Sequence, residues 1–257
     1  MVVILDKLPT LPLLGKFHFS VAPLATVAEW LWEQATHEHI SHWVVTANPE
    51  VVEQALASPD GVGFLHKATC LVPDGAGVVW ALRRVAKRTQ AKTLPTRVPG
   101  VELAEALLAR CAQHGQGVAL LGASPQVMEA LPTKLADRLG QAVPLVFTHH
   151  GFFKAGDEAM GLALQAAKAR PRLVLVALGV PRQEAWIAAH QHLFADGTLL
   201  MGVGGSFDVW AGVVKRAPKL MQRLNLEWAW RLALQPWRLQ RSLPPLLRFV
   251  GRVLLRG

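Results

Sequence analysis

Short runs of consecutive apolar residues recur along the chain, and each is followed by a turn-forming segment and then by a helical pattern. A run without alternation between apolar and polar residues is typical of a strand buried on both faces of a sheet. Strands that alternate with helices are typical of a parallel sheet covered on both sides. The pattern therefore predicts an α/β fold with a Rossmann-like, mostly parallel sheet, whose strands we expect at residues 42–46, 68–72, 117–121, 173–178 and 198–203.

The segments that follow these strands all contain Gly, Asn, Asp or Pro. Ligands of such sheets bind at the carboxyl ends of the strands, and the N-terminus of a helix presents free N–H groups to a phosphate. Ordinary turns use the same residue types, but five such loops together favour a site for a phosphorylated ligand. The helices after them are expected over residues 51–57, 78–87 and 126–139, with a further helix that ends near residue 193.

The pattern changes near residue 215. Residues 215–234 have apolar side chains at four-residue spacing, which predicts a helix. A second helix is expected over residues 235–243, with Pro244 and Pro245 breaking it and residues 246–255 resuming it. Arginine is interleaved there with leucine and tryptophan, as in a helix that lies in the plane of a membrane surface.

The charge of the chain is concentrated in this same segment. The 257 residues include 27 Lys and Arg against 18 Asp and Glu, and 51% are hydrophobic, which excludes intrinsic disorder. Residues 1–214 are neutral overall, so residues 215–257, with Glu227 as their single acid, carry the whole net charge of +9. We therefore expect an α/β domain at 1–214 and a basic, amphipathic appendage at 215–257 that meets an anionic partner, either a membrane surface or nucleic acid. The arginines expected to contact lipid phosphates include Arg223, Arg231, Arg238, Arg241, Arg248 and Arg252.

Other features exclude several kinds of protein. Two cysteines, Cys70 and Cys111, are too few for a disulfide framework or a zinc site and indicate free thiols in a reducing cytosol. The first residues lack the basic segment and the uninterrupted apolar run of a signal peptide. No uncharged run approaches the ~20 apolar residues that a membrane-spanning helix needs, so we expect a chain that does not cross a membrane.

Neither a dinucleotide nor a metal is expected. The glycine-rich segment 202–205 lacks the third glycine of the dinucleotide-binding fingerprint, because Phe207 stands there, and this disfavours a nicotinamide-dependent oxidoreductase. His37, His39 and His42 lie close together without nearby cysteine or a carboxylate cluster, which favours a surface helix end over a metal site. The chain has no Asp-x-Asp pair to hold a divalent metal, so we predict no metal site and no cofactor.

Several loops carry side chains suited to catalysis or to phosphate binding. Asp74 follows one strand, where a carboxylate can act as a general base or, alternatively, cap the next helix. Thr46 and Asn48 offer a hydroxyl and an amide to a sugar or diphosphate, or belong to a helix cap with Pro49 at the first helical position. Arg97 either neutralises a phosphate by a bidentate contact or lies in a solvated loop.

Taken in order, these loops resemble those of the WecG/TagA/CpsF family of bacterial glycosyltransferases. The resemblance covers nearly the whole chain past residue 40, on segments 46–50 (TANPE), 73–80 (PDGAGVVW), 97–100 (RVPG), 148–153 (THHGFF), 179–184 (GVPRQE), 202–208 (GVGGSFD), 215–218 (KRAP), 226–228 (LEW) and 231–232 (RL). It implies transfer of a sugar from a UDP-sugar to a polyprenyl-diphosphate-linked sugar, with inversion and without a required metal. In the best-known members the donor is UDP-N-acetylmannosamine or its uronic acid, the acceptor is undecaprenyl-diphosphate-linked N-acetylglucosamine, and the product is β-linked.

The resemblance also implies roles for individual residues. Asp74 matches the proposed catalytic base, which would deprotonate the acceptor hydroxyl. The tail arginines match an appendage that touches lipid and helps to close the site over the leaving diphosphate, where arginine would neutralise the developing charge. The residues that match the substrate pocket or its glycine-rich segment are Thr46, Asn48, Arg97, Gln183, Gly204 and Gly205.

Three departures from the family pattern concern the donor sugar. Pro99 replaces a threonine in the Arg97 segment, residues 87–96 are longer and more basic than usual, and Phe152 stands where tyrosine is common. Hydroxyl groups often select substrates, so these departures leave open whether N-acetylmannosamine or a related hexose or uronic acid is transferred.

The sequence thus predicts a glycosyltransferase of surface-polysaccharide synthesis, peripheral on the inner face of the cytoplasmic membrane. Its expected partners are a UDP-sugar, a polyprenyl-diphosphate-linked sugar and an anionic membrane surface, and a homo-oligomer is left open. The alternative is a nucleic-acid-binding α/β protein that uses the basic tail. It is disfavoured because the tail interleaves arginine with apolar residues and contains no recognised nucleic-acid-binding motif.

Overall fold

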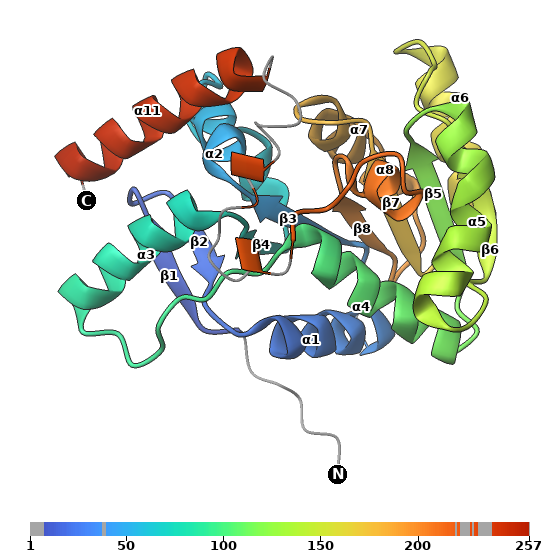
Figure 1. Ribbon diagram of the computed structural model, residues 1–257, viewed down its shortest axis with the longest axis horizontal. Helices are drawn as coiled ribbons and strands as arrows, with labels where there is room; N and C mark the ends of the chain where they lie inside the picture. The colour runs from blue at the N-terminus through green and yellow to red at the C-terminus, as the bar shows by residue number, and fades with distance from the viewer. Residues whose placement is uncertain are drawn as a thin grey trace.

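The computed structural model describes residues 8–37, 40–218, 220–221, 227, 229–230 and 238–256. Six parallel strands form its main sheet in the order β4-β3-β8-β7-β5-β6 (Figure 1). The predicted α/β fold with a parallel sheet is confirmed. The strands are β3 (His42–Ala47), β4 (Cys70–Pro73), β5 (Val118–Gly122), β6 (Leu145–His149), β7 (Leu173–Ala177) and β8 (Leu199–Gly202).

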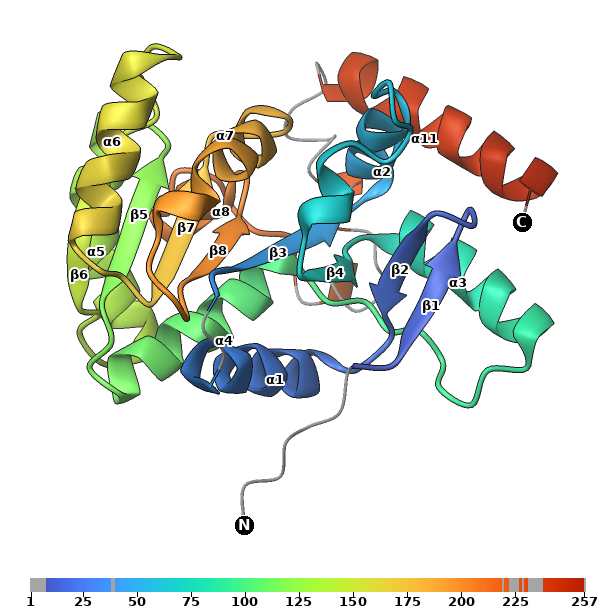
Figure 2. The same ribbon diagram turned by 180° about the vertical axis from the view of Figure 1, so that it is seen from behind.

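Helices cover both faces of this sheet, as Figures 1 and 2 show from opposite sides. One face packs against α1 (Leu24–His37), α4 (Gly100–Gln113), α5 (Pro125–Leu139) and the short α8 (Ser206–Trp210). The other face packs against α2 (Pro49–Leu56), α3 (Ala76–Thr89), α6 (Asp157–Lys168), α7 (Arg182–His190) and α11 (Arg238–Arg256). An antiparallel hairpin, β1 (Thr10–Leu13) with β2 (Phe17–Ser20), and two 3-10 helices, η1 (Gly63–Lys67) and η2 (Gln191–Leu193), also belong to this second side.

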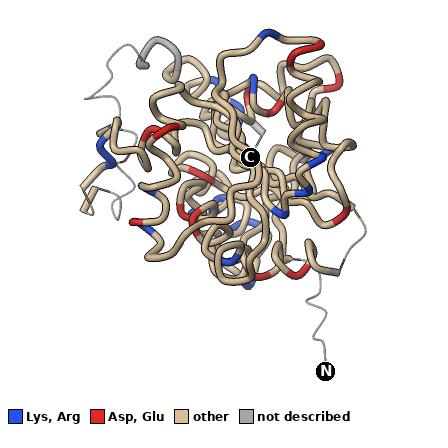
Figure 3. The backbone as a smooth tube through the Cα atoms, turned by 90° about the vertical axis from the view of Figure 1, so that its right-hand side faces the viewer, with Lys and Arg blue, Asp and Glu red and all other residues tan. Residues whose placement is uncertain are grey.

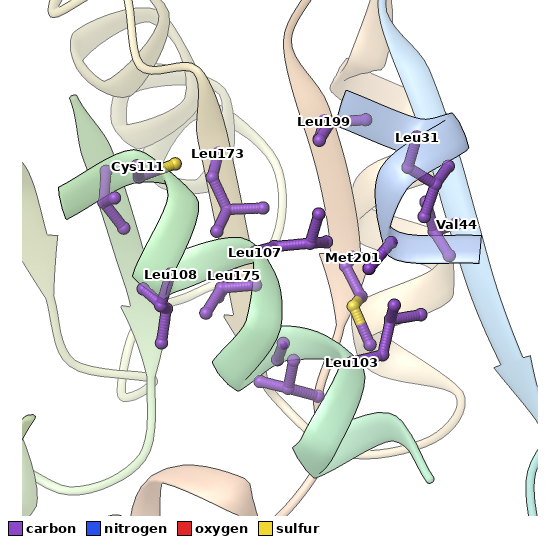
Figure 4. Close-up of a cluster of buried hydrophobic side chains, with 14 of the residues drawn as sticks. Leu31, Val44, Leu103, Leu107, Leu108, Cys111, Leu173, Leu175, Leu199 and Met201 are labelled. Atoms are coloured by element: carbon purple, nitrogen blue, oxygen red, sulfur yellow. The ribbon is translucent and has the colours of Figure 1, made fainter. Parts of the chain in front are cut away.

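The core has two layers because neighbouring residues of a strand point to opposite faces. In β7, Leu173 and Leu175 are buried on the side of α4, whereas Val174 and Val176 are buried on the side of α7. Figure 4 shows the first layer, where Leu107 of α4 lies over the neighbouring strands β7 and β8. Each such buried side chain contributes about 1.5–3 kcal/mol, so continuous apolar strands are what this double-sided sheet requires.

All five predicted strands are present, as β3, β4, β5, β7 and β8, and their ends differ from the prediction by no more than two residues. The sequence prediction does not include β6, although Leu145, Val146 and Phe147 are apolar. In the structure β6 is an edge strand that alternates between exposed and half-buried residues. The sequence prediction also omits the β1–β2 hairpin and the helices α1, α4 and α6. Of these helices, α4 follows another helix and α6 follows the unpredicted strand, so neither continues a run from a predicted strand.

The prediction that Pro244 and Pro245 break the tail helix is wrong, because α11 is a single helix that contains both prolines. Each proline removes one N–H bond to the preceding turn, but its fixed φ is compatible with a helix. Packing offsets the loss: Phe249 and Val253 are fully buried in the core layer that includes α2. Of the helix predicted over 215–234, residues 215–218 have no regular structure, residues 220–221, 227 and 229–230 are helical, and the rest lies outside the described residues.

The connections of β3 and β8 leave a crevice at the carboxyl edge of the sheet. These two strands are neighbours, yet the chain passes from β3 to α2 on one face and from β8 to α8 on the other. A sheet whose adjacent connections diverge in this way binds ligands in the crevice between them. The loops after β3, β4, β7 and β8 therefore define where a site can form.

Candidate active site

A pocket occupies this crevice, and it brings together all seven residues that the sequence placed at the catalytic centre and substrate pocket. Four of the loops involved follow strands, and Arg97 comes from the segment that leads into α4. The pocket also contains Arg216 and Glu227, which sequence reasoning did not assign to the site. The seven predicted residues that line it are Thr46, Asn48, Asp74, Arg97, Gln183, Gly204 and Gly205.

Asp74 follows β4 directly and does not cap the helix after it. Gly75 is the N-cap of α3, and no side chain caps that helix. One oxygen of Asp74, Oδ1, lies 3.4 Å from Nε of Arg97, and the other, Oδ2, accepts a hydrogen bond from the Gly100 N–H at 3.4 Å. The Asp74 side chain is 30% exposed, so its carboxylate is held by donors yet remains open to a ligand in the pocket.

Arg97 lies between two carboxylates and is not a solvated loop arginine. Its side chain is 17% exposed, with Nε toward Asp74 and a terminal nitrogen 2.7 Å from Oε2 of Glu227. Burial by itself would lower the pKa of the Arg97 guanidinium, but the charges of Asp74 and Glu227 raise it above its ordinary value. Arg97 therefore stays cationic, and its charge favours the ionised form of Asp74 beside it.

A second arginine, Arg216, extends this network to the other end of the pocket. Its Nε lies 3.4 Å from Oε1 of Glu227, and a terminal nitrogen lies 2.5 Å from Oε1 of Glu102 in α4. Glu227 is 8% exposed and thus bridges Arg97 and Arg216. Two sequence signals point to this role: segments 215–218 and 226–228 match the family pattern, and Glu227 is the single acid of a strongly basic segment.

Thr46 and Asn48, both at the end of β3, hold the start of two helices. Asn48 is the N-cap of α2, since its Oδ1 accepts the Val51 N–H at 3.1 Å. Asn48 therefore caps a helix, which is one of the two alternatives predicted, and also lines the pocket. Thr46 lies against Gly100 at the first turn of α4, where a Cβ would come within 2.9 Å of the Thr46 hydroxyl oxygen. Glycine at 100 allows α4 to begin in contact with β3, which brings its N–H to Asp74.

Gln183 is fixed by hydrogen bonds on both sides of its amide. Its Oε1 accepts the Gly204 N–H at 2.9 Å, and its Nε2 donates to Oε1 of Glu184 at 2.8 Å. Gly202 makes room for this arrangement, because a Cβ there would come within 2.5 Å of the Gln183 amide nitrogen. These contacts set the position of the glycine-rich loop after β8 relative to α7.

Glu184, which supports Gln183, is a buried carboxyl with an unusual pKa. Its side chain is almost fully buried, and within the described residues Oε2 has no hydrogen-bond partner. Burial, together with the nearby charge of Glu50, raises the pKa of Glu184 from 4.5 to about 7, although the hydrogen bond from Gln183 opposes this. The carboxyl therefore binds its proton more tightly in the folded chain than in the unfolded one.

This shift predicts that the fold is more stable in mild acid. Between about pH 4.5 and pH 7, Glu184 is protonated in the folded chain and ionised in the unfolded one, so the free energy of unfolding falls as the pH rises through this window and levels off above it. The loss is at most about 3 kcal/mol. Urea unfolding of wild type and Glu184→Gln at several pH values measures it, and the variant is expected to lack this part of the pH dependence. An identical dependence in both proteins would contradict the assignment.

Among the described arginines of residues 215–257, Arg216 lines the pocket, whereas Arg248 and Arg252 do not. Arg252 and Arg248 of α11 face Glu53 of α2, with Nε of Arg252 3.1 Å from Oε1 and Nε of Arg248 3.9 Å from Oε2. Glu53 is buried, so these pairs attach α11 to the α/β body. The side chains of Arg238 and Arg241, and all of Arg223 and Arg231, lie outside what the structure describes. Within the described ranges, no helix has both the length and the apolar composition needed to span a bilayer.

The histidines do not form a metal centre in the described part of the chain, where no three His, Cys, Asp or Glu side chains are grouped to hold an ion. His42 is fully buried at the start of β3, which contradicts its placement at a surface helix end. Ile40, just before β3, is 53% exposed, and burial begins at His42 because β3 is a central strand with a neighbour on each side.

The crevice therefore holds a partly exposed carboxylate beside two largely buried guanidinium groups at the carboxyl edge of a parallel sheet. This arrangement defines an α/β enzyme that binds an anionic ligand between its strand-end loops. Comparison with known protein families identifies which kind of enzyme this is. Residues 13–257 match the model of the glycosyl transferase WecG/TagA/CpsF family. The chain belongs to this family and is a glycosyltransferase.

Curated relatives support this placement. Two proteins from Staphylococcus aureus strains MW2 and NCTC 8325 are 38% identical to the chain, and one from strain MRSA252 is 37% identical. Each alignment covers 197 residues, which are 76% of this chain and 73% of the relative. All three are named N-acetylglucosaminyldiphosphoundecaprenol N-acetyl-beta-D-mannosaminyltransferase.

Proposed function

We propose that the enzyme transfers N-acetylmannosamine, or a related hexose or uronic acid, from a UDP-sugar to N-acetylglucosamine linked to a polyprenyl diphosphate. The observation that carries this proposal is the placement of Asp74 beside Arg97 in a pocket at the carboxyl edge of the sheet, in a chain of this family. The name of the Staphylococcus aureus relatives supports the lipid-linked acceptor and the transferred sugar.

In the proposed reaction, Asp74 is the general base. Its carboxylate takes the proton of the acceptor hydroxyl while the hydroxyl oxygen bonds to the anomeric carbon of the donor. The bond from that carbon to the diphosphate oxygen breaks, UDP leaves with the electron pair, and the configuration inverts. The guanidinium groups of Arg97 and Arg216 lie in the same pocket and would stabilise the negative charge that develops on the diphosphate.

The proposed place of action is the inner face of the cytoplasmic membrane. A polyprenyl acceptor is held in a bilayer, so the enzyme must meet it at that surface. The basic residues of the appendage, 215–257, favour an anionic surface, and Leu247 and Leu254 of α11 are exposed beside Arg248. The division of the chain at residue 214 and the oligomeric state remain predictions.

A panel of UDP-sugars, assayed with a short-chain acceptor of N-acetylglucosamine on a lipid diphosphate, tests the proposal. Release of UDP is measured with and without the acceptor. We expect acceptor-dependent release to be fastest with UDP-N-acetylmannosamine or its uronic acid. Equal release with and without acceptor, or release from no UDP-sugar of the panel, would contradict the proposed reaction.

A further inference from the structure

Basic residues gather on α3 and on the segment that follows it, well away from the appendage in sequence. Between residues 75 and 101 the chain has six basic residues and no acid, although residues 1–214 as a whole are neutral. Elsewhere in the body, basic and acidic residues are interspersed (Figure 3). Arg97 belongs to the pocket, and the other five are Arg83, Arg84, Lys87, Arg88 and Lys92.

Exposed apolar side chains accompany these charges. Trp80 is 37% exposed, and the Arg84 guanidinium lies over its ring at 5.5 Å from the centroid. Leu94 is 66% exposed, whereas Lys87 and Lys92 are exposed on either side of the turn that ends α3. We call Trp80, Arg84, Lys87, Arg88, Lys92 and Leu94 the α3 basic face. Basic residues interleaved with tryptophan and leucine are typical of surfaces that bind at the interface of a bilayer.

The α3 basic face lies at the same end of the molecule as α11. In Figures 1 and 2 the C-terminal ends of both helices point to one end of the longest axis. The helices meet at the start of α3, where a Cβ on Gly77 would lie 3.7 Å from Leu246. At this end α11 exposes apolar residues of its own, with Leu254 at 55% and Leu255 at 88%.

We propose that the α3 basic face binds the anionic surface of a lipid bilayer and forms a second membrane contact beside the appendage. This inference rests on the proposed function in one respect, since that function places the acceptor in a bilayer. Two contacts from separate parts of the chain fix the tilt of the molecule on the surface, which a single helix does not. Nucleic acid would explain the charge, and a base could stack on Trp80, but it would not explain why the aliphatic Leu94 is 66% exposed within the same face.

The proposal is tested with a triple variant and a variant matched in charge. Lys87→Gln, Arg88→Gln and Lys92→Gln together remove three positive charges from the α3 basic face. Lys134→Gln, Lys168→Gln and Arg170→Gln remove the same number from exposed positions on or next to α5 and α6, on other parts of the surface. Both variants have the same net charge, so only the position of the lost charges differs. Thermal unfolding checks that both fold like the wild type.

Binding to vesicles that contain phosphatidylglycerol is measured by co-sedimentation. Each basic residue near an anionic surface strengthens binding severalfold, so we expect the α3 variant to bind about a hundredfold more weakly than wild type. The matched variant is expected to bind like wild type, and added salt is expected to weaken binding of the wild type. Wild-type binding by the α3 variant, or an equal loss in both variants, would overturn the proposal. Salt-sensitive binding of wild type to duplex DNA without binding to vesicles would overturn it in favour of nucleic acid.

A label at position 94 tests whether the face enters the lipid interface. Cys70 and Cys111 are buried, and burial raises the pKa of both thiols to about 12, so neither competes for a thiol-directed dye. We expect an environment-sensitive dye on Leu94→Cys to shift to the blue with anionic vesicles, and a dye on Lys134→Cys not to shift. A dye at position 94 that does not respond would overturn the apolar part of the proposal.

The same preparations separate this inference from the proposed function. UDP release with a short-chain acceptor in solution is expected to be equal in wild type and both triple variants, because none of the replaced residues lines the pocket. If no sugar transfer is found while vesicle binding depends on the α3 basic face, the proposed function is contradicted and the membrane-binding role of this face is supported. If transfer is found and the α3 variant binds vesicles like the wild type, the membrane-binding role of the α3 basic face is contradicted and the proposed function is supported.

Discussion

Asp74→Asn is expected to reduce sugar transfer by 100-fold to 10,000-fold, which is the usual contribution of a positioned general base. Asparagine keeps the shape of aspartate, and its oxygen can still accept the Gly100 N–H, which lies 3.4 Å from Asp74 Oδ2. What it cannot do is take a proton from the acceptor hydroxyl. The effect should therefore appear in kcat, while binding of UDP stays equal or becomes tighter, because a negative charge beside the diphosphate site has been removed.

The control for this variant is Asp137→Asn. Asp137 is exposed on α5, on the opposite side of the β3–β8 crevice from the β4 loop, and does not line the pocket. The Asp137→Asn variant should transfer sugar at the same rate as the wild type. Isothermal titration with UDP and steady-state UDP release measure binding and kcat separately. Turnover by Asp74→Asn within a few-fold of wild type would remove Asp74 from the role of base.

Arg97→Lys is expected to lower transfer by roughly 100-fold, the cost of losing one well-placed charged donor at a developing anion. Arg97 reaches Asp74 through Nε and Glu227 through a terminal nitrogen, and it is mostly buried. The single ammonium of lysine keeps the charge but does not reach both carboxylates in this geometry. One of them is then left without its partner, which also weakens the attachment of the Glu227 segment to the body.

Two comparisons separate the charge of Arg97 from its geometry. Arg97→Ala removes both and should be more severe than Arg97→Lys, with a raised KM for the UDP-sugar as well as a lower kcat. Arg138→Lys is the control, because Arg138 pairs with Glu105 outside the pocket and should tolerate lysine. If Arg97→Lys retains wild-type kcat and KM, the two contacts of Arg97 have no part in the reaction.

Much of the site could be predicted because parallel strands end at one edge of a sheet. Thr46, Asp74 and Gly204 are far apart in sequence, yet each lies at the end of a predicted strand or just after it, so a parallel sheet places them together whatever the details of packing. This argument does not apply to Arg97, because Arg97 follows no strand. Its assignment to the substrate pocket rests on the family resemblance. Its position depends on the Val98 N–H, which donates to the Pro73 carbonyl and holds this segment against the end of β4.

The ion pairs that join Arg97 to Glu227, and Arg216 to Glu227 and Glu102, could not be predicted from the sequence. Glu227 meets Arg97 across 130 positions of the chain, and Arg216 meets Glu102 across 114. No local pattern specifies such pairs, because they arise only when the segment after α8 passes back over the pocket. The helix α11 illustrates a related limit: Pro244 and Pro245 predict a break locally, and the burial of Phe249 and Val253 decides otherwise.

These long-range contacts also bear on the order in which the enzyme becomes active during its synthesis. Asp74 and Arg97 leave the ribosome well before Glu227, and Glu53 leaves it 199 positions before Arg252. Domains fold progressively from the N-terminal side at a synthesis rate of about 5–20 residues per second. A nascent chain that already has its sheet thus still lacks the anion that joins Arg97 to Arg216. The pocket is completed only once residue 227 has been added, after every strand of the main sheet and α8 have already been synthesised.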